Sequence, residues 1–145
     1  MVVSRASRLK LRHANHSSRG ELASLLDRIA QADRIAFASL HARLRPRLAA
    51  QLAMVPLVPT DVTAVADATF VEVWRLAGRL NAQETDALAW IRAIAARRAG
   101  DRWVARMALP MTEGQQLNLL ATFDRQIETE LCALLAHSPS TGDER

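Results

Sequence analysis

The chain of 145 residues is poor in several residue types: it has one cysteine, five glycines, five prolines and no tyrosine. A lone cysteine, Cys132, cannot form a disulfide within the chain, which is typical of a reducing compartment. No apolar run approaches the roughly 20 residues that a membrane-spanning helix requires. Sustained alternation of apolar and polar residues and tight hairpin turns are also missing. We therefore expect a cytoplasmic, all-α protein that does not enter a membrane.

The residues of common catalytic and metal sites are few and scattered. Of the four histidines, only His13 and His16 are close to each other in the sequence, and no third metal ligand lies near them. No paired carboxylates stand out, and no nucleophile lies beside a base. The five glycines form no phosphate-binding loop. We therefore expect no catalytic residues, no bound metal and no cofactor.

The charges are unevenly distributed along the chain. Residues 1–109 carry 17 Arg or Lys against 9 Asp or Glu, whereas residues 110–145 carry 2 against 6. A basic body favours a polyanionic partner, and an acidic tail can repel that partner or fold back on the body. Eighteen of the 19 basic residues are arginine. The planar guanidinium suits phosphate contacts, although a GC-rich genome produces the same bias without functional meaning.

Apolar residues at spacings of three and four predict five helices. We expect them near residues 21–30, 33–52, 60–79, 86–107 and 113–137. Asp33 is expected to cap the second helix, and Thr60 or Asp61 the third. Pro46 is expected to kink or divide the second helix. A single compact helical bundle follows from this pattern and from the chain length.

The same pattern divides the chain into four parts. Residues 1–19 are expected to form a basic flexible arm, which either keeps the protein soluble or seeks nucleic-acid phosphates. Residues 20–109 form the main helical domain, residues 110–137 an amphipathic helix, and residues 138–145 a disordered tail. The amphipathic helix carries an apolar stripe that must be buried, either across the domain or against a second copy of the chain. The stripe consists of Leu117, Leu120, Phe123, Ile127, Leu131 and Leu134.

Rotation by roughly 100° per residue divides the third and fourth helices into faces. The third helix is expected to bury one arc around Phe70 and to expose the other. The exposed arc is Ala64, Asp67, Ala68, Val71, Glu72 and Arg75. In the fourth helix, Ile91 and Ile94 belong to a buried arc, and Arg98 is expected to pair with Asp101. His41 is expected to pack inside the bundle.

Two segments carry a resemblance to a known family. The sequence TFVEVWR at residues 69–75 is followed by AWIRAIAARRAGDRW at residues 89–103, with Trp90 sixteen positions after Trp74. Together they resemble region 2 of the extracytoplasmic-function sigma factors, and the resemblance covers roughly residues 20–107. It implies a helical bundle that binds the clamp helices of the RNA polymerase core and the non-template strand of the promoter −10 element.

The resemblance and the interleaving of basic and aromatic residues assign a DNA-binding set in this chain, since cations follow phosphates and rings stack on unpaired bases. The set consists of Arg79, Trp90, Arg92, Arg97, Arg98, Arg102, Trp103 and Arg106. At Arg97 the family often has asparagine. An exposed arginine-rich face that binds nothing is the alternative.

Other positions depart from the family pattern. Where the family has polar residues that contact polymerase, this chain has Ala64, Asp67 and Ala68. The second helical domain, region 4, has no counterpart after Pro110. Two functions therefore stay open. One is a sigma-type transcription factor, and the other is a derived interaction module that self-associates or binds a regulator such as an anti-sigma factor.

Overall fold

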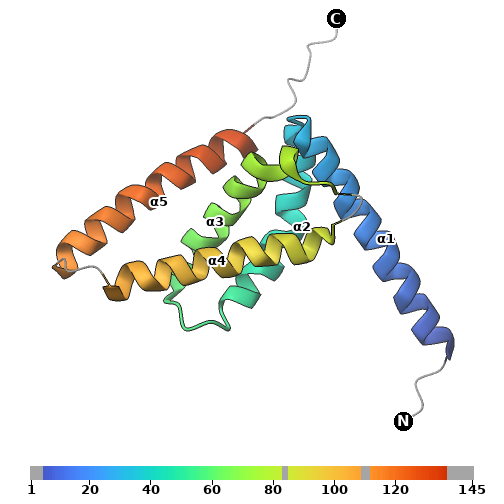
Figure 1. The fold of residues 1–145 in the computed structure, drawn as a ribbon, viewed down its shortest axis with the longest axis horizontal. Coiled ribbons are helices and arrows are strands. Elements are labelled where there is room, and N and C mark those ends of the chain that lie inside the picture. The colour runs from blue at the N-terminus through green and yellow to red at the C-terminus, as the bar shows by residue number, and fades with distance from the viewer. Residues whose placement is uncertain (1–4, 83–84, 109–111, 137–145) are drawn as a thin grey trace, which may run out of the picture.

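A computed structural model describes residues 5–82, 85–108 and 112–136. Across these residues the chain is helical and contains no strand, which confirms the predicted all-α bundle (Figure 1). Within the same ranges no helix is long and apolar enough to cross a membrane. The helices are α1 Arg5–Ala30, α2 Arg34–Leu52, α3 Pro59–Leu76, the 3-10 turn η1 Ala77–Arg79, α4 Ala87–Ala108 and α5 Glu113–Leu135.

Helix α3 lies at the centre of the bundle. Helices α2, α4 and α5 all pack against it, and the C-terminal half of α1 closes the bundle over α2 and η1. Figure 1 shows the N-terminal half of α1 projecting away from the other helices. This arrangement gives α3 three helical neighbours, and the charged residues of its sequence therefore have to find partners inside the protein.

Local sequence signals set most of the helix boundaries. Asp33 caps α2 by accepting hydrogen bonds from the backbone N–H groups of Ile35 and Ala36, as predicted. The α1–α2 turn places Ala32 at a φ of 62°. Helix α5 begins with a capping box, in which Thr112 and Gln115 each accept a bond from the other's backbone. The Asp33 cap and the left-handed backbone of Ala32 explain why the predicted break at residues 31–33 is found.

Two boundary predictions are wrong, and a third is decided only in part. Neither Thr60 nor Asp61 caps α3: Val58 is the N-cap and Pro59 occupies the first turn, where its missing N–H costs nothing. Of the two outcomes expected at Pro46, division of α2 is excluded, because the helix is continuous through this residue. The predicted flexible arm is helical from Arg5 onward, since this segment is rich in residues with good helix propensity. The predicted tail at 138–145 lies outside the described residues.

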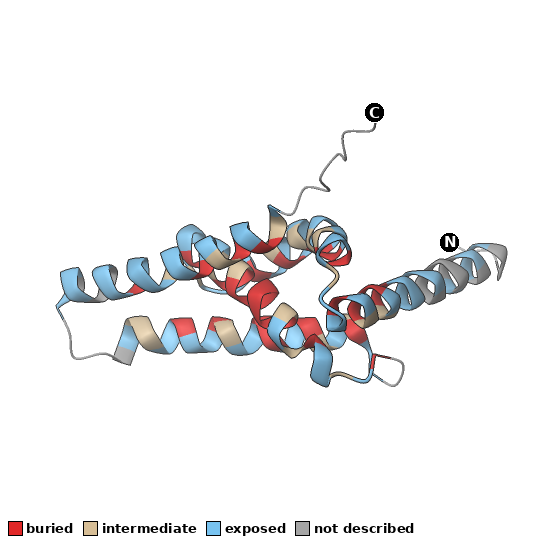
Figure 2. Ribbon diagram, turned by 90° about the horizontal axis from the view of Figure 1, so that it is seen from above, coloured by how far each residue is buried: buried red, intermediate tan, exposed pale blue. Residues whose placement is uncertain are grey.

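The core lies between α2, α3 and α4 and under the C-terminal half of α1 (Figure 2). Phe37 and Phe70 are fully buried, and Phe37 meets the ring of Trp74 edge to face at 5.4 Å between centroids. The predicted α3 core arc is largely confirmed. Its buried members are Val65, Ala66, Thr69, Phe70, Val73 and Ala77, while Val62, Leu76 and Leu80 are half-buried.

His41 packs inside the bundle, as predicted, against the ring of Phe70 at 4.8 Å between centroids. Its Nε2 atom is buried without a hydrogen-bond partner. Burial lowers the pKa of this imidazole, and the nearby Arg45 charge lowers it further. Because the unfolded chain then takes up a proton more readily than the folded one, His41 reduces stability as the pH falls below about 6.5.

Replacing His41 with phenylalanine should therefore stabilise the protein. We expect the free energy of unfolding to rise by about 1 kcal/mol at pH 7.5, because the unpaired ring nitrogen is removed. The gain should be larger at pH 5, where protonation of the unfolded wild-type chain adds to it. Urea unfolding at both pH values measures this difference. An equal gain at the two pH values would contradict the assigned role of the imidazole.

Candidate partner and nucleic-acid interface

A buried carboxylate ties the N-terminal end of α3 to α4. Asp61 is 0% exposed. Its Oδ1 accepts hydrogen bonds from Arg102 Nε at 2.9 Å and from Arg106 Nη2 at 2.7 Å, and its Oδ2 accepts a further bond from Arg106 Nε. Two guanidinium groups thus converge on one carboxylate that water does not reach.

A second carboxylate repeats this arrangement further along α3. Glu72 accepts a hydrogen bond from Arg98 Nε at 2.6 Å and another from Arg97. Eleven residues, about three helical turns, separate Asp61 from Glu72 and place both on the same side of α3. Because α4 runs antiparallel to α3, its earlier arginines meet Glu72 and its later ones meet Asp61. We call these two contacts the α3–α4 ion clamps.

Both clamp carboxylates are ionised at neutral pH. Burial raises the pKa of Asp61, but hydrogen bonds from Arg106 and Arg102 and their charges lower it by more, so the pKa lies below its ordinary value. The same balance, with Arg98 and Arg97 as donors, lowers the pKa of Glu72. Four positive charges of α4 are therefore matched by carboxylates within the chain.

The ion clamps correct one predicted ion pair and account for half of the predicted DNA-binding residues. Arg98 does not pair with Asp101, which is exposed, but with Glu72. Four members of the set, Arg97, Arg98, Arg102 and Arg106, lie in the ion clamps. Of these, Arg102 is the most deeply buried. Arg98, Arg102 and Arg106 lie at the contact between two helices rather than on an open flank, whereas Arg97 is exposed and reaches Glu72 from the edge of that contact.

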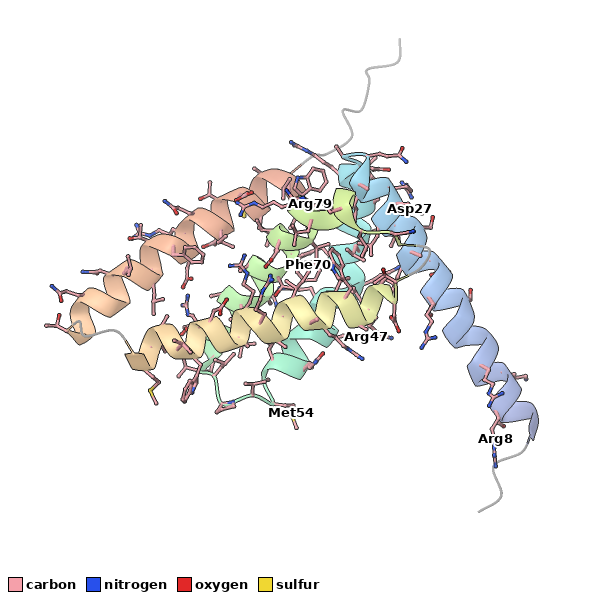
Figure 3. The ribbon with its side chains drawn as sticks, in the orientation of Figure 1. Arg8, Asp27, Arg47, Met54, Phe70 and Arg79 are labelled. Atoms are coloured by element: carbon pink, nitrogen blue, oxygen red, sulfur yellow. The ribbon has the colours of Figure 1, made fainter. Side chains whose placement is uncertain are left out.

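The other four members of the predicted set do not share one surface. Trp90 is half-buried against the core, whereas Arg92 and Arg79 are exposed. Trp103 is 47% exposed and lines a hollow of about 390 Å³ with the α2–α3 loop. Figure 3 shows Arg79 on the opposite side of α4 from Met54 of that loop. The structure thus brings Trp103 to one edge of α4 and leaves Arg79 at the other.

Helix α5 covers the face of α3 that we expected to be exposed. Ala68, Val71 and Glu72 are buried, and Ala64 and Asp67 are half-buried. Of the two places proposed for the α5 stripe, the structure has it packed across its own domain, with Leu120, Ile127, Leu131 and Leu134 buried. Phe123 stays 44% exposed, and the side chain of Leu117 lies outside the described residues.

Ion pairs join α5 to both of its neighbours. Arg75 of α3, exposed as predicted, meets Glu130 of α5 through Nη2 at 2.5 Å and Nε at 3.2 Å. Arg102 of α4 donates two hydrogen bonds of 2.7 Å to the carboxylate of Asp124. Arg102 therefore bridges α3 and α5, since its Nε already belongs to Asp61.

One charge contact under α5 is unfavourable. Asp67 of α3 is half-buried and has Arg45 at 3.6 Å. Burial raises the pKa of its carboxyl; the Arg45 charge lowers it, and the charges of Glu128 and Asp124 on α5 raise it. The net pKa lies above the ordinary value. Helix α5 thus brings negative charge toward a carboxylate that is already poorly solvated.

A groove of about 350 Å³ opens between α4 and α5, with α3 as its floor. Small side chains, Ala64 and Ala68, leave this space above the floor, and Leu119 and Phe123 form its apolar wall on α5. The complete lining is Ala64, Val65, Ala68, Arg98, Asp101, Arg102, Ala105, Leu119, Leu120, Phe123 and Asp124. Such a groove can hold apolar side chains, with charged groups available at its edge.

Sequence reasoning missed Asp61 as a functional residue, because we placed it at the N-cap. A signal was available: two carboxylates three turns apart on α3 match two arginine pairs on α4. Metal chemistry finds no support in the described ranges, where no three His, Cys, Asp or Glu side chains are grouped to hold an ion. Protein-family models, curated proteins and solved structures were compared with the chain, and none matches.

Proposed function

We propose that this chain is a sigma-like regulatory protein whose region 2-like bundle acts as a protein-interaction module in transcription, without opening promoter DNA itself. The observation that carries this proposal is the neutralisation of Arg97, Arg98, Arg102 and Arg106 by the α3–α4 ion clamps. A guanidinium group held by a buried carboxylate is not available to a phosphate, because removing it leaves that carboxylate unpaired.

The features that remain exposed suit a protein partner better than a nucleic acid. Eight large apolar side chains are exposed in two groups, one on the α2–α3 loop and the end of α4 and the other on the N-terminal half of α5. They are Met54, Val55, Val58, Trp103, Val104, Met107, Leu119 and Phe123. Apolar surface gathered in this way is typical of a protein-binding site.

The resemblance supplies candidate partners. RNA polymerase core is the first, although Ala64, Asp67 and Ala68 replace the polar contacts that the family pattern would provide. A regulator such as an anti-sigma factor is the second. A second copy of the chain, joined through its C-terminal helix, is the third.

Promoter DNA binding is a second candidate function, and one observation favours it. Arg92 and Trp103 are eleven residues apart on α4, so they lie on one side of the helix and both are exposed. A cation and a ring on one side can hold a phosphate and an unpaired base. Exposed basic residues Arg8, Lys10 and Arg12 on α1 would add affinity that does not depend on sequence.

A site-specific crosslinker tests the interaction proposal. Benzoylphenylalanine replaces Phe123 in the groove or, as a control, Ile35, which is 55% exposed on α2. After irradiation in bacterial cells that express the chain, we expect a discrete protein adduct from position 123 and none from position 35. Identical adducts at both positions, or no adduct at 123, would contradict the proposal.

Fluorescence anisotropy with a labelled single-stranded oligonucleotide separates the two functions. If the ion clamps hold, we expect no saturable binding at about 50 mM salt. Binding that weakens about tenfold or more by about 200 mM salt, and is lost in Trp103→Ala, would establish the DNA-binding candidate instead.

A further inference from the structure

The contacts of α5 with α3 and α4 are well matched at two points and poorly matched at two others. The matched points are the Arg75–Glu130 and Arg102–Asp124 ion pairs. One mismatch is electrostatic: Glu128 and Asp124 bring negative charge toward Asp67, which is half-buried. Helix α5 thus fits the surface beneath it only in part.

The second mismatch is in packing. The C-terminal half of α5 buries Ile127, Leu131 and Leu134, but the N-terminal half leaves the groove of about 350 Å³ open above Ala64 and Ala68. In this half Leu119 and Phe123 are 52% and 44% exposed. Apolar side chains that face a groove without filling it lose dispersion contacts that a better-fitting occupant would make.

The strength of the attachment also differs along α5. Arg75 and Glu130 are both partly exposed to solvent, so their pair is screened and contributes little. Figure 2 shows α4 and α5 as separate rods, and the Arg102–Asp124 pair joins them. Most of the attachment therefore comes from the buried apolar residues in the C-terminal half of the helix.

From these observations we propose that the surface beneath α5 is a docking site for an acidic amphipathic helix of a partner protein, and that α5 is its intramolecular competitor. The site is the α3 face Ala64, Ala68 and Val71 together with Arg75 and Arg102. This inference rests on the proposed function, for which it names the kind of partner. Helix α5 shows which chemistry fits, because it already occupies part of the site.

The mismatches define the partner more closely. Its helix carries two carboxylates six residues apart, as Asp124 and Glu130 are, to pair with Arg102 and Arg75. It has no carboxylate where Glu128 approaches Asp67. It places larger apolar side chains in the groove above Ala64 and Ala68. A helix with these features would displace α5 because it makes the same ion pairs and better packing.

The test uses the full chain and a fluorescein-labelled peptide with the sequence of residues 113–136, whose binding is followed by anisotropy. Two chain variants, Glu130→Arg and Glu128→Arg, make the same change two positions apart. Glu130→Arg sets a positive charge against Arg75 and loosens α5, so the peptide should bind about two to five times more tightly than to the wild-type chain. Glu128→Arg relieves the repulsion of Asp67, so the peptide should bind no more tightly than to wild type.

A charge swap checks the docking position. A peptide with Glu130→Arg should bind the Glu130→Arg chain at least several-fold more weakly than the unmodified peptide does. A chain that carries Arg75→Glu alone, whose own Glu130 is then repelled by residue 75, should restore binding of the modified peptide. Equal affinity for the wild-type and both single-variant chains would overturn the proposal. Dimers of the Glu130→Arg chain that do not bind peptide would also overturn it, because the occupant would then be a second copy.

Hydrogen exchange on the unmodified chain gives a readout that does not depend on variants. Amides of α5 should exchange faster than those of α3, because α5 detaches without global unfolding. Exchange of both helices through one common opening would contradict a detachable α5. Neither experiment contains nucleic acid or a transcription component, so their failure is distinct from failure of the crosslinking test of the proposed function.

Discussion

Replacing Asp61 with asparagine is expected to lower the free energy of unfolding by about 3–5 kcal/mol, as measured by urea denaturation at neutral pH. Asparagine keeps the shape of the side chain but removes its charge. Arg102 is buried and donates hydrogen bonds to Asp61 and Asp124. Arg106 donates to the same carboxylate of Asp61. Without that charge, the buried guanidinium group of Arg102 keeps only one of its two carboxylate partners, and the contact between α3 and α4 weakens.

A matched control lies on α4 itself. Asp101 is exposed and next to Arg102 in the sequence, so Asp101→Asn should change stability by no more than about 0.5 kcal/mol. Similar losses in the two variants would show that the clamp at Asp61 adds nothing specific.

Acid titration provides a second comparison for the same variant. Because the folded-state pKa of Asp61 lies below its ordinary value, its stabilisation is present above the unfolded-state pKa and is lost as the pH falls through the folded-state pKa. The Asp61→Asn protein should therefore lose less stability than the wild type when the pH is lowered through this range.

The second large effect is expected at Phe70. Replacing Phe70 with alanine should lower the free energy of unfolding by about 3–5 kcal/mol. Its ring is fully buried at the centre of the bundle (Figure 3). It meets the ring of His41 edge to face. Neighbouring helices cannot close the resulting cavity completely, since the core around α3 is packed from three sides. Denaturant unfolding with an unchanged m-value would confirm that the native fold persists.

Phe123→Ala serves as the control for this change. It removes the same ring from a position on α5 that is 44% exposed, so we expect a loss of less than about 1.5 kcal/mol. If the two substitutions cost the same, Phe70 would not be part of the packed core. If Phe123→Ala cost more, the wall of the groove would be a stronger structural element than the exposure of its ring indicates.

Local patterns made most of the fold predictable. The spacing of apolar residues located α2 to α5, and the Asp33 cap marked where α2 starts. The apolar arc around Phe70 predicted the side of α3 that enters the core. What could not be read was the part of α1 that precedes residue 21, because its sequence has no continuous apolar face to reveal a helix.

The candidate site was less predictable, because its partners are distant in sequence. Rotation about one helix places Arg98 near a core arc, but only the packing of α4 on α3 brings it to Glu72, 26 residues away. The same holds for Asp61 and Arg102, which are 41 residues apart. A face that is polar in sequence can be an internal contact when a neighbouring helix supplies opposite charge, and periodicity alone does not distinguish these cases.

The two carboxylates three turns apart also limit how α4 can move. A single attachment would let one helix pivot about a point. Two attachments on one side prevent both axial sliding and rolling, because either motion would separate Asp61 and Glu72 from their arginines at the same time. Helix α5 has one ion pair to α4 and one, partly exposed, to α3, so its charged contact with each neighbour is fixed at a single point. Mechanical rigidity and the ability to open are thus assigned to different helices of the same small protein.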